Sequence, residues 1–109
     1  MILFQLQFEV APERQPAFEA AFGEIFLPAL RKQKGFVSAR FVRLYAPAQI
    51  AEIGAAPTEF NYQVIFMFES EGHRRAWAAS ADHDVAWPAF SGLARNNFTW
   101  RGFDVLAGT

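Results

Sequence analysis

Two histidines are the side chains in this sequence best suited to acid–base chemistry. His73 and Trp77 are four residues apart, a spacing that places them on the same face of a helix. His83 lies between Asp82 and Asp84, either of which could orient its imidazole or raise its basicity through a hydrogen bond. A neutral imidazole in a cavity accepts a proton, so both histidines are candidate catalytic bases.

Each histidine also has a structural interpretation. His73 could be a partly exposed side chain beside a core tryptophan, and His83 could lie in a solvated turn in which Asp82 only caps a helix. Adjacent residues point in different directions, so residues 82–84 make a poor metal site, and we predict no metal. The sequence has no cysteine, which excludes disulfides and thiolate catalysis.

Basic, amide and aromatic side chains supply the candidate substrate-binding residues, which are Arg40, Arg101, Gln5, Gln7, Gln63, Trp77 and Trp87. The arginines could hold a phenolate or carboxylate, or could pair with acidic residues at the rim of a sheet. The glutamines could orient a ligand, or could satisfy one another's hydrogen bonds. The tryptophans could stack on an aromatic substrate or belong to the core, and we expect Trp100 to be a core residue.

The composition predicts more apolar surface than a small monomer can expose to water. Hydrophobic residues make up 52% of the 109 positions, 13 of them phenylalanine, and charged residues only 19%. This excess favours a subunit interface or an enclosed cavity. The net charge of −1 argues against nucleic-acid binding. No apolar run is long enough for a bilayer and the start reads as a strand, so we expect a cytoplasmic protein with no membrane partner.

Hydrophobic periodicity predicts the order βαββαβ. Alternating residues predict strands within 2–10, 36–45, 62–69 and 97–105. Between the second and third strands, residues 46–59 are predicted to form a long connection, whose Ile50 and Ile53 imply that it packs against another surface.

Helical periodicity fills the two remaining intervals. The first helix starts near Pro12 and is stopped by Gly35 in the C′ position, with Pro28 expected to kink it or loosen its end. The second starts at an N-cap, Ser70, and is expected to break into two pieces because Pro88 disfavours helical geometry in the residue before it. Asp82 could cap the short continuation.

This order predicts an α+β, ferredoxin-like fold, a four-stranded antiparallel sheet with two helices on one face. The phenylalanine-rich phase of the first strand belongs under the helices. The opposite face then carries Leu3, Gln5, Gln7, Ser38, Arg40, Val42, Gln63, Ile65, Met67, Thr99, Arg101 and Phe103. Because this face is too apolar for open water and too polar for a dry core, a second copy packed on it would enclose a mixed lumen. Residues 1–109 are therefore predicted to be a single dimeric α/β-barrel domain.

A more specific pattern lies between residues 62 and 90. An apolar strand leads to Glu69-Ser70-Glu71, then to the segment from His73 to Trp77, and then to the turn Ser80-Ala81-Asp82-His83. This pattern resembles the antibiotic biosynthesis monooxygenase family of the dimeric α/β-barrel superfamily, in which a strand ending in Ser-Glu leads to a helix and a Ser-x-x-His turn. Residues 27–30 and the pair at 35–36 are similar to that family's first helix and its exit into strand two.

The resemblance implies a homodimer with a ligand pocket in each subunit between the sheet and the helices. Some members of the family oxidise polycyclic phenols with dioxygen, without metal or flavin, and others are haem-degrading enzymes, isomerases, cyclases or proteins of no known activity. Haem degradation matches poorly, because Trp87 stands where those enzymes have an iron-ligating histidine and Gln5 or Gln7 where they use asparagine.

The sequence thus predicts a cofactor-independent, monooxygenase-like enzyme that abstracts a proton from a small aromatic or polyketide-like substrate. His83 or His73 would be the base, and Arg101 and Arg40 would stabilise the anion. One alternative is a non-catalytic dimeric module that binds a small apolar ligand or only builds an interface. Another is an isomerase or cyclase that uses the same base without oxygen.

Overall fold

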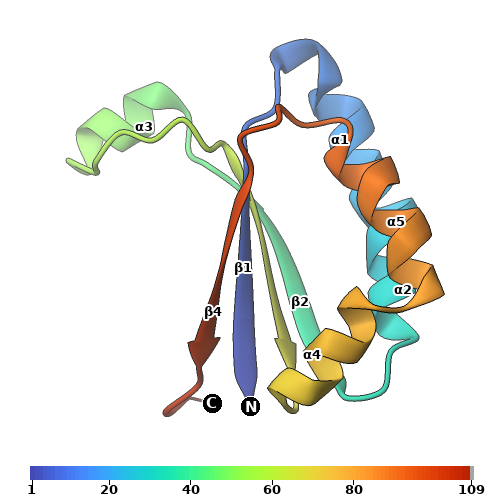
Figure 1. Cartoon of the computed structure of the whole chain (residues 1–109). Coiled ribbons are helices and arrows are strands. Elements are labelled where there is room, and N and C mark those ends of the chain that lie inside the picture. The colour runs from blue at the N-terminus through green and yellow to red at the C-terminus, as the bar shows by residue number, and fades with distance from the viewer. Residues whose placement is uncertain (109) are drawn as a thin grey trace.

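A four-stranded antiparallel sheet in the order β2-β3-β1-β4 is the frame of the molecule (Figure 1). The computed structural model describes residues 1–108. The strands are β1 (Ile2–Phe8), β2 (Phe36–Arg43), β3 (Tyr62–Phe68) and β4 (Thr99–Asp104). This sheet, with helices packed on one face, confirms the predicted ferredoxin-like βαββαβ fold.

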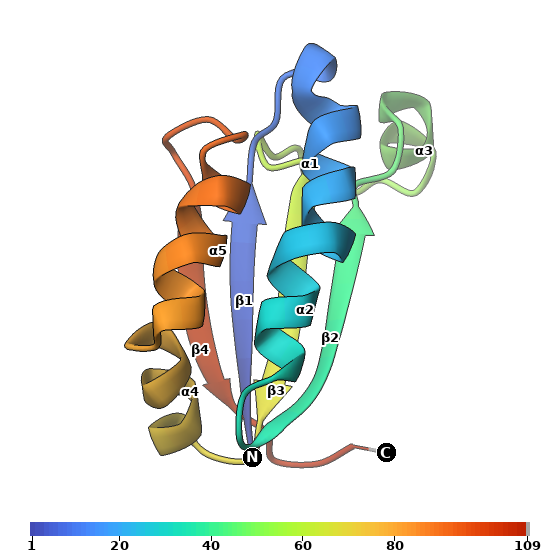
Figure 2. The same cartoon turned by 90° about the vertical axis from the view of Figure 1, so that its right-hand side faces the viewer.

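The helices form two parallel columns on one face of the sheet (Figure 2). The first column is a 3-10 turn (Pro12–Arg14), α1 (Gln15–Ala21), a π-helical turn (Phe22–Phe26) and α2 (Leu27–Arg31). The second column is α4 (Glu71–Ala78) and α5 (Ala81–Ser91). A further short helix, α3 (Pro47–Glu52), projects beyond the strand ends on the other side of the sheet (Figure 1). The predicted connection between β2 and β3 is therefore partly helical, because Pro47 suits the first turn of a helix.

The register of the strands confirms the two predicted faces. Leu6 lies opposite Val64 and Trp100, on the face that the helices cover. On the other face the predicted side chains stand in cross-strand rows, which are Ser38, Met67, Leu3 and Phe103, then Arg40, Ile65, Gln5 and Arg101, then Val42, Gln63, Gln7 and Thr99. We call these rows the open face. No helix covers them in Figure 1.

The first helical column is disturbed just before Pro28, and its end differs from the prediction at Gly35. The chain stays helical to Arg31 instead of loosening, and the disturbance precedes the proline: the N–H of Leu27 donates to the carbonyl of Phe22, one residue farther back than in an α-helix. A proline removes one α-helical hydrogen bond, and the π-helical turn accommodates that loss. Gly35 lies beyond the C-cap residue, so it is a turn glycine with φ +81° and not the C′ residue.

The second column is broken as predicted, but at a different place. Ser70 caps α4, accepting a hydrogen bond from the N–H of His73. Ser80, and not Asp82, caps α5 by accepting from the N–H of His83 at 3.1 Å. The prediction of a break at Pro88 was wrong, because this proline lies inside α5 and costs only its own hydrogen bond.

We expect Gly35→Ala to destabilise the protein more than Gly54→Ala. Both glycines have positive φ, which costs an alanine about 1–2 kcal/mol. A Cβ on Gly35 would also lie 2.4 Å from Cγ of His73, whereas one on Gly54 would meet no atom within 4 Å. Overpacking of this kind adds roughly 1–3 kcal/mol. Urea unfolding of the two variants measures the difference, and equal losses would show that the contact with His73 is easily relieved.

Candidate functional site

A cavity of ≈ 220 Å³ lies between the α4–α5 column and the helix-covered face of the sheet. Its lining is mostly apolar and aromatic, as is usual for sites that bind small molecules. The sheet contributes Phe4, Leu6, Phe66 and Trp100, and the helices contribute Phe26, Arg74, Trp77, Ala78, His83 and Trp87.

His83 is the titratable side chain at the centre of the aromatic part of this lining. Its ring packs edge-on to Trp77, with the centroids 4.9 Å apart, and parallel to Trp87 at 5.9 Å. Trp87 in turn lies 6.4 Å from Trp100. The imidazole therefore packs against two indole rings at the wall of the cavity.

Trp100 is not the core residue that its strand phase predicted. Its side chain is 57% exposed. The reason is its position on β4, an edge strand that pairs only with β1 and leaves the indole at the rim of the cavity. An edge position gives a side chain neighbours on one side only.

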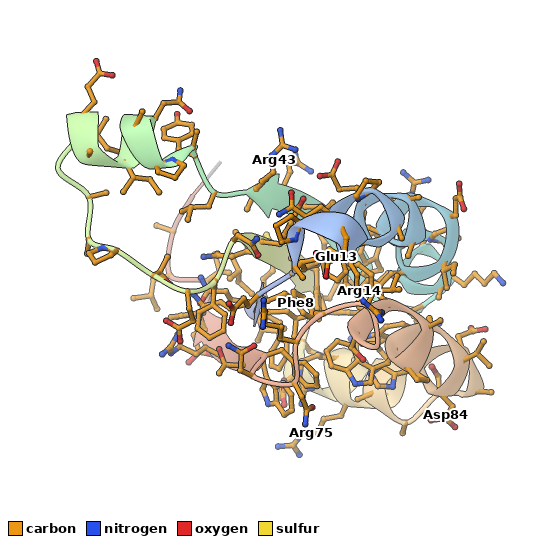
Figure 3. All side chains as sticks on the ribbon, turned by 90° about the horizontal axis from the view of Figure 1, so that it is seen from above. Phe8, Glu13, Arg14, Arg43, Arg75 and Asp84 are labelled. Carbon is orange, nitrogen blue, oxygen red and sulfur yellow. The ribbon has the colours of Figure 1, made fainter. Side chains whose placement is uncertain are left out.

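The start of α5 positions His83. Ser80 fixes the first turn of the helix through its N-cap hydrogen bond. Asp82 accepts a hydrogen bond from Nε2 of Gln33 at 2.9 Å and thereby connects α5 to the end of the first column. Asp84 is exposed and points away from the interior (Figure 3). Within residues 1–108, neither aspartate forms a hydrogen bond with the imidazole.

Burial lowers the pKa of His83 below its ordinary value of 6.5, and the charge of Asp84 opposes only part of that shift. The imidazole is therefore neutral near pH 7. A neutral imidazole can accept a proton from a bound ligand, which makes His83 a competent general base.

His73 lies outside this cavity. Its Nδ1 is 2.7 Å from Oγ of Ser70, the N-cap residue of the same helix. Its ring packs so closely on Gly35 that no side chain would fit there. These contacts connect the start of α4 to the turn before β2, so they give His73 a structural role.

The predicted arginines and glutamines lie on the open face, with the sheet between them and the cavity. Nε2 of Gln5 donates to Oε1 of Gln63 at 3.0 Å. Arg101 donates to Oε1 of Gln7 at 3.0 Å, and Arg40 donates to the carbonyl of Ala39. The structure therefore brings Trp77 and Trp87 together with His83, but not the other candidate binding residues.

Arg74 is the charged residue of the cavity that the sequence prediction missed. It lies one turn before Trp77 and Ala78 on α4, and all three line the cavity. The spacing i, i+3, i+4 places such residues on one helix face, so Trp77 was the signal that could have found it.

Neither a metal site nor a membrane span is found in the described part of the chain. Among residues 1–108, no group of three or more His, Cys, Asp or Glu side chains could hold a metal ion. None of the helices there has the length and apolar character needed to cross a membrane.

The sheet order, the single helical layer and the cavity define a ferredoxin-like α+β protein. No family model matches the sequence, and no curated protein matches it. Solved structures do resemble it. SnoaB, a cofactor-independent oxygenase from Streptomyces nogalater, in a variant form, has 17% identity and a TM-score of 0.75, over 98% of this chain and 94% of the other.

Two further structures are similar in the same way. An antibiotic biosynthesis monooxygenase has 11% identity and a TM-score of 0.70, covering 98% of this chain and 100% of the other. A dimeric ferredoxin-like protein of unknown function from Jannaschia sp. CCS1 has 16% identity and a TM-score of 0.72, covering 96% and 100%. These likenesses confirm the predicted resemblance to antibiotic biosynthesis monooxygenase-like proteins at the level of the fold.

We expect the imidazole of His83 to titrate below pH 6.5, and Asp84→Asn to lower its pKa further, because the substitution removes a negative charge that favours the protonated ring. The unfolded chain binds this proton at higher pH than the folded chain. The free energy of unfolding should therefore fall as the pH drops below 6.5, down to the folded-state pKa. NMR titration of the ring protons measures both pKa values, and a wild-type midpoint above 6.5 would contradict the burial.

Proposed function

We propose that the protein is a cofactor-independent monooxygenase-like enzyme that acts on a small aromatic substrate, with His83 as its general base. The observation that carries the proposal is a neutral imidazole that lines an apolar cavity between Trp77 and Trp87. The fold shared with a cofactor-independent oxygenase supports it.

The chemistry needs a base, a water-poor site and dioxygen. A phenolic substrate gives its hydroxyl proton to His83, and the resulting anion transfers an electron to dioxygen. Recombination forms a carbon–oxygen bond and leaves a peroxide anion, which takes the proton back from His83 and becomes a hydroperoxide. This hydroperoxide loses its outer oxygen and the hydrogen of the same carbon as water, which leaves a quinone-type carbonyl. One oxygen atom of dioxygen enters the product and the other leaves in water. The aromatic walls disfavour water around the anion while it reacts.

The size of the cavity limits the substrate. An engineered apolar cavity of about 150 Å³ binds benzene, and sites for drug-sized ligands start at roughly 300 Å³. At ≈ 220 Å³ the cavity lies between these values. A compact aromatic molecule of one or two fused rings fits that range and stacks on the tryptophans.

We expect His83→Asn to lower kcat at least about 100-fold, which is the lower limit for removal of a general base. KM should change much less, because the indole walls remain. Oxygen uptake with dihydroxynaphthalene as the phenolic probe measures both constants. His73→Asn is the comparison, and it should retain most of the turnover because His73 lies outside the cavity.

The outcomes separate the alternative functions. Loss of turnover in His73→Asn but not in His83→Asn would identify His73 as the base. Binding of the probe without oxygen uptake or any change in the probe would indicate a non-catalytic binding module. Conversion without oxygen uptake would indicate an isomerase or cyclase.

We also propose that each subunit is one domain of residues 1–109 and that its open face packs on the open face of a second copy. Several apolar side chains of this face stay accessible, with Val42 42% and Phe103 47% exposed. They stand beside glutamines and arginines that already bond to protein groups. Covering a sheet surface of this composition removes apolar side chains from water, which stabilises the assembly. A dimeric ferredoxin-like protein with the same fold supports the proposal.

Ile65→Glu should convert the dimer to a monomer, because it places a charge at the middle of the open face, between Gln5 and Arg40. Val85→Glu is the matched control. Val85 is 70% exposed on α5, so its substitution should leave the assembly unchanged. Light scattering after size-exclusion chromatography gives the mass of each variant, and a monomeric wild type would refute the proposal.

A further inference from the structure

Arg74 is the permanently charged residue among those that line the cavity in residues 1–108. Only 19% of its side chain is exposed, and its Cζ lies 4.7 Å from the ring centroid of Phe4. A guanidinium in this position keeps its charge but has lost much of its water. Its interaction with an anion nearby is stronger than it would be on an open surface.

Glu71 holds this guanidinium in a fixed orientation. Nε of Arg74 donates to Oε1 of Glu71 at 2.6 Å, and Nη2 donates to Oε2 at 2.7 Å. These hydrogen bonds lower the pKa of Glu71 to about 2 and raise the pKa of Arg74, so both groups are ionised at neutral pH. The guanidinium is therefore pre-oriented before any ligand arrives.

The end of the guanidinium formed by Nη1 and the second N–H of Nη2 has no hydrogen-bond partner in the described chain. A guanidinium carries five N–H groups, and Glu71 uses one on Nε and one on Nη2. Nη1 donates no hydrogen bond to residues 1–108. If this atom were fully buried it would count as a buried polar atom without a partner, and the described residues contain none. Nη1 is thus accessible, and with the second N–H of Nη2 it forms a fork that matches two carboxylate oxygens.

The neighbouring charged groups do not neutralise the positive charge at this site. Arg75 also donates to Glu71, at 3.1 Å, so two guanidinium groups share one carboxylate and the cluster keeps an excess of positive charge. The two arginines differ in place, because the Arg75 side chain is 75% exposed and points outward (Figure 3). Arg74 alone of the pair lines the cavity.

We propose that Arg74 is a specificity-determining residue, and that the cavity takes a compact aromatic molecule with a carboxylate substituent. This inference rests on the proposed function and names its substrate class. The aromatic ring lies against the indole walls, and the carboxylate meets the free edge of the guanidinium. Arg74 holds the ligand, and His83 is the proton acceptor.

Naphthoate and naphthamide make a matched pair of probes, because they share the ring system and differ in charge. Calorimetric titration of the wild-type protein should give one site per chain and at least about tenfold tighter binding of naphthoate, as expected for hydrogen bonds to a charged group. Arg74→Gln should bring the two affinities to within about twofold, chiefly by weakening naphthoate. Arg75→Gln is the control and should preserve the wild-type preference.

Each result supports or overturns the proposal. Equal binding of the two probes by the wild type overturns the role of Arg74 and leaves the cavity and the proposed function standing. An equal loss of preference in Arg75→Gln overturns it too, because the preference would then come from the positive charge of the surface and not from the hydrogen bonds of Arg74. Binding of neither probe overturns both the inference and the cavity on which the proposed function rests. Arg74→Lys, which keeps the charge but loses the fork, should bind naphthoate with intermediate affinity and replaces Arg74→Gln if that variant does not fold.

Discussion

The strict alternation of side chains along β1 is the constraint on which the rest of the structure depends. Leu6 and Phe8 point to the helices, while Gln5 and Gln7 point to the open face. Because a one-residue slip would exchange the two sets, burial of the aromatic face fixes the register of the whole sheet. Phe8 then contacts the rings of Phe18 and Phe90, one in each helical column, at 5.2 and 5.3 Å. A single buried strand thereby positions both columns.

The cavity forms where this aromatic packing ends. Phe18 and Phe90 stack at 4.3 Å and leave no space between α1 and α5. Farther along, the second column is broken at Ser80. The hydroxyl of Ser80 donates to the carbonyl of Trp77 at the end of α4 and accepts from the backbone N–H of His83 at the start of α5. The two indoles on either side of this break, at positions 77 and 87, line the cavity. One serine therefore places both walls of the aromatic site.

Local sequence was sufficient for the order of elements, for the open face and for Ser70 as an N-cap, because each depends on periodicity or on a single side chain. It did not separate Ser80 from Asp82 as the second cap, since both residue types accept a backbone hydrogen bond equally well. It also could not show which face of α4 meets the sheet. That choice depends on long-range packing, so Arg74 was missed, and the sequence did not show that the sheet separates Arg40 and Arg101 from His83.

The two proposed sites are separated only by the thickness of the sheet, and this links assembly to ligand binding. On β4, Trp100 borders the cavity while its neighbour Arg101 belongs to the open face. This edge strand is exposed along its length and pairs with β1 alone. A second copy that covered the open face would hold Arg101 in place and, through the shared backbone, the indole at the cavity rim. In the proposed dimer the partner subunit would therefore order the rim of the cavity, because β4 has no second neighbour within its own sheet to do so.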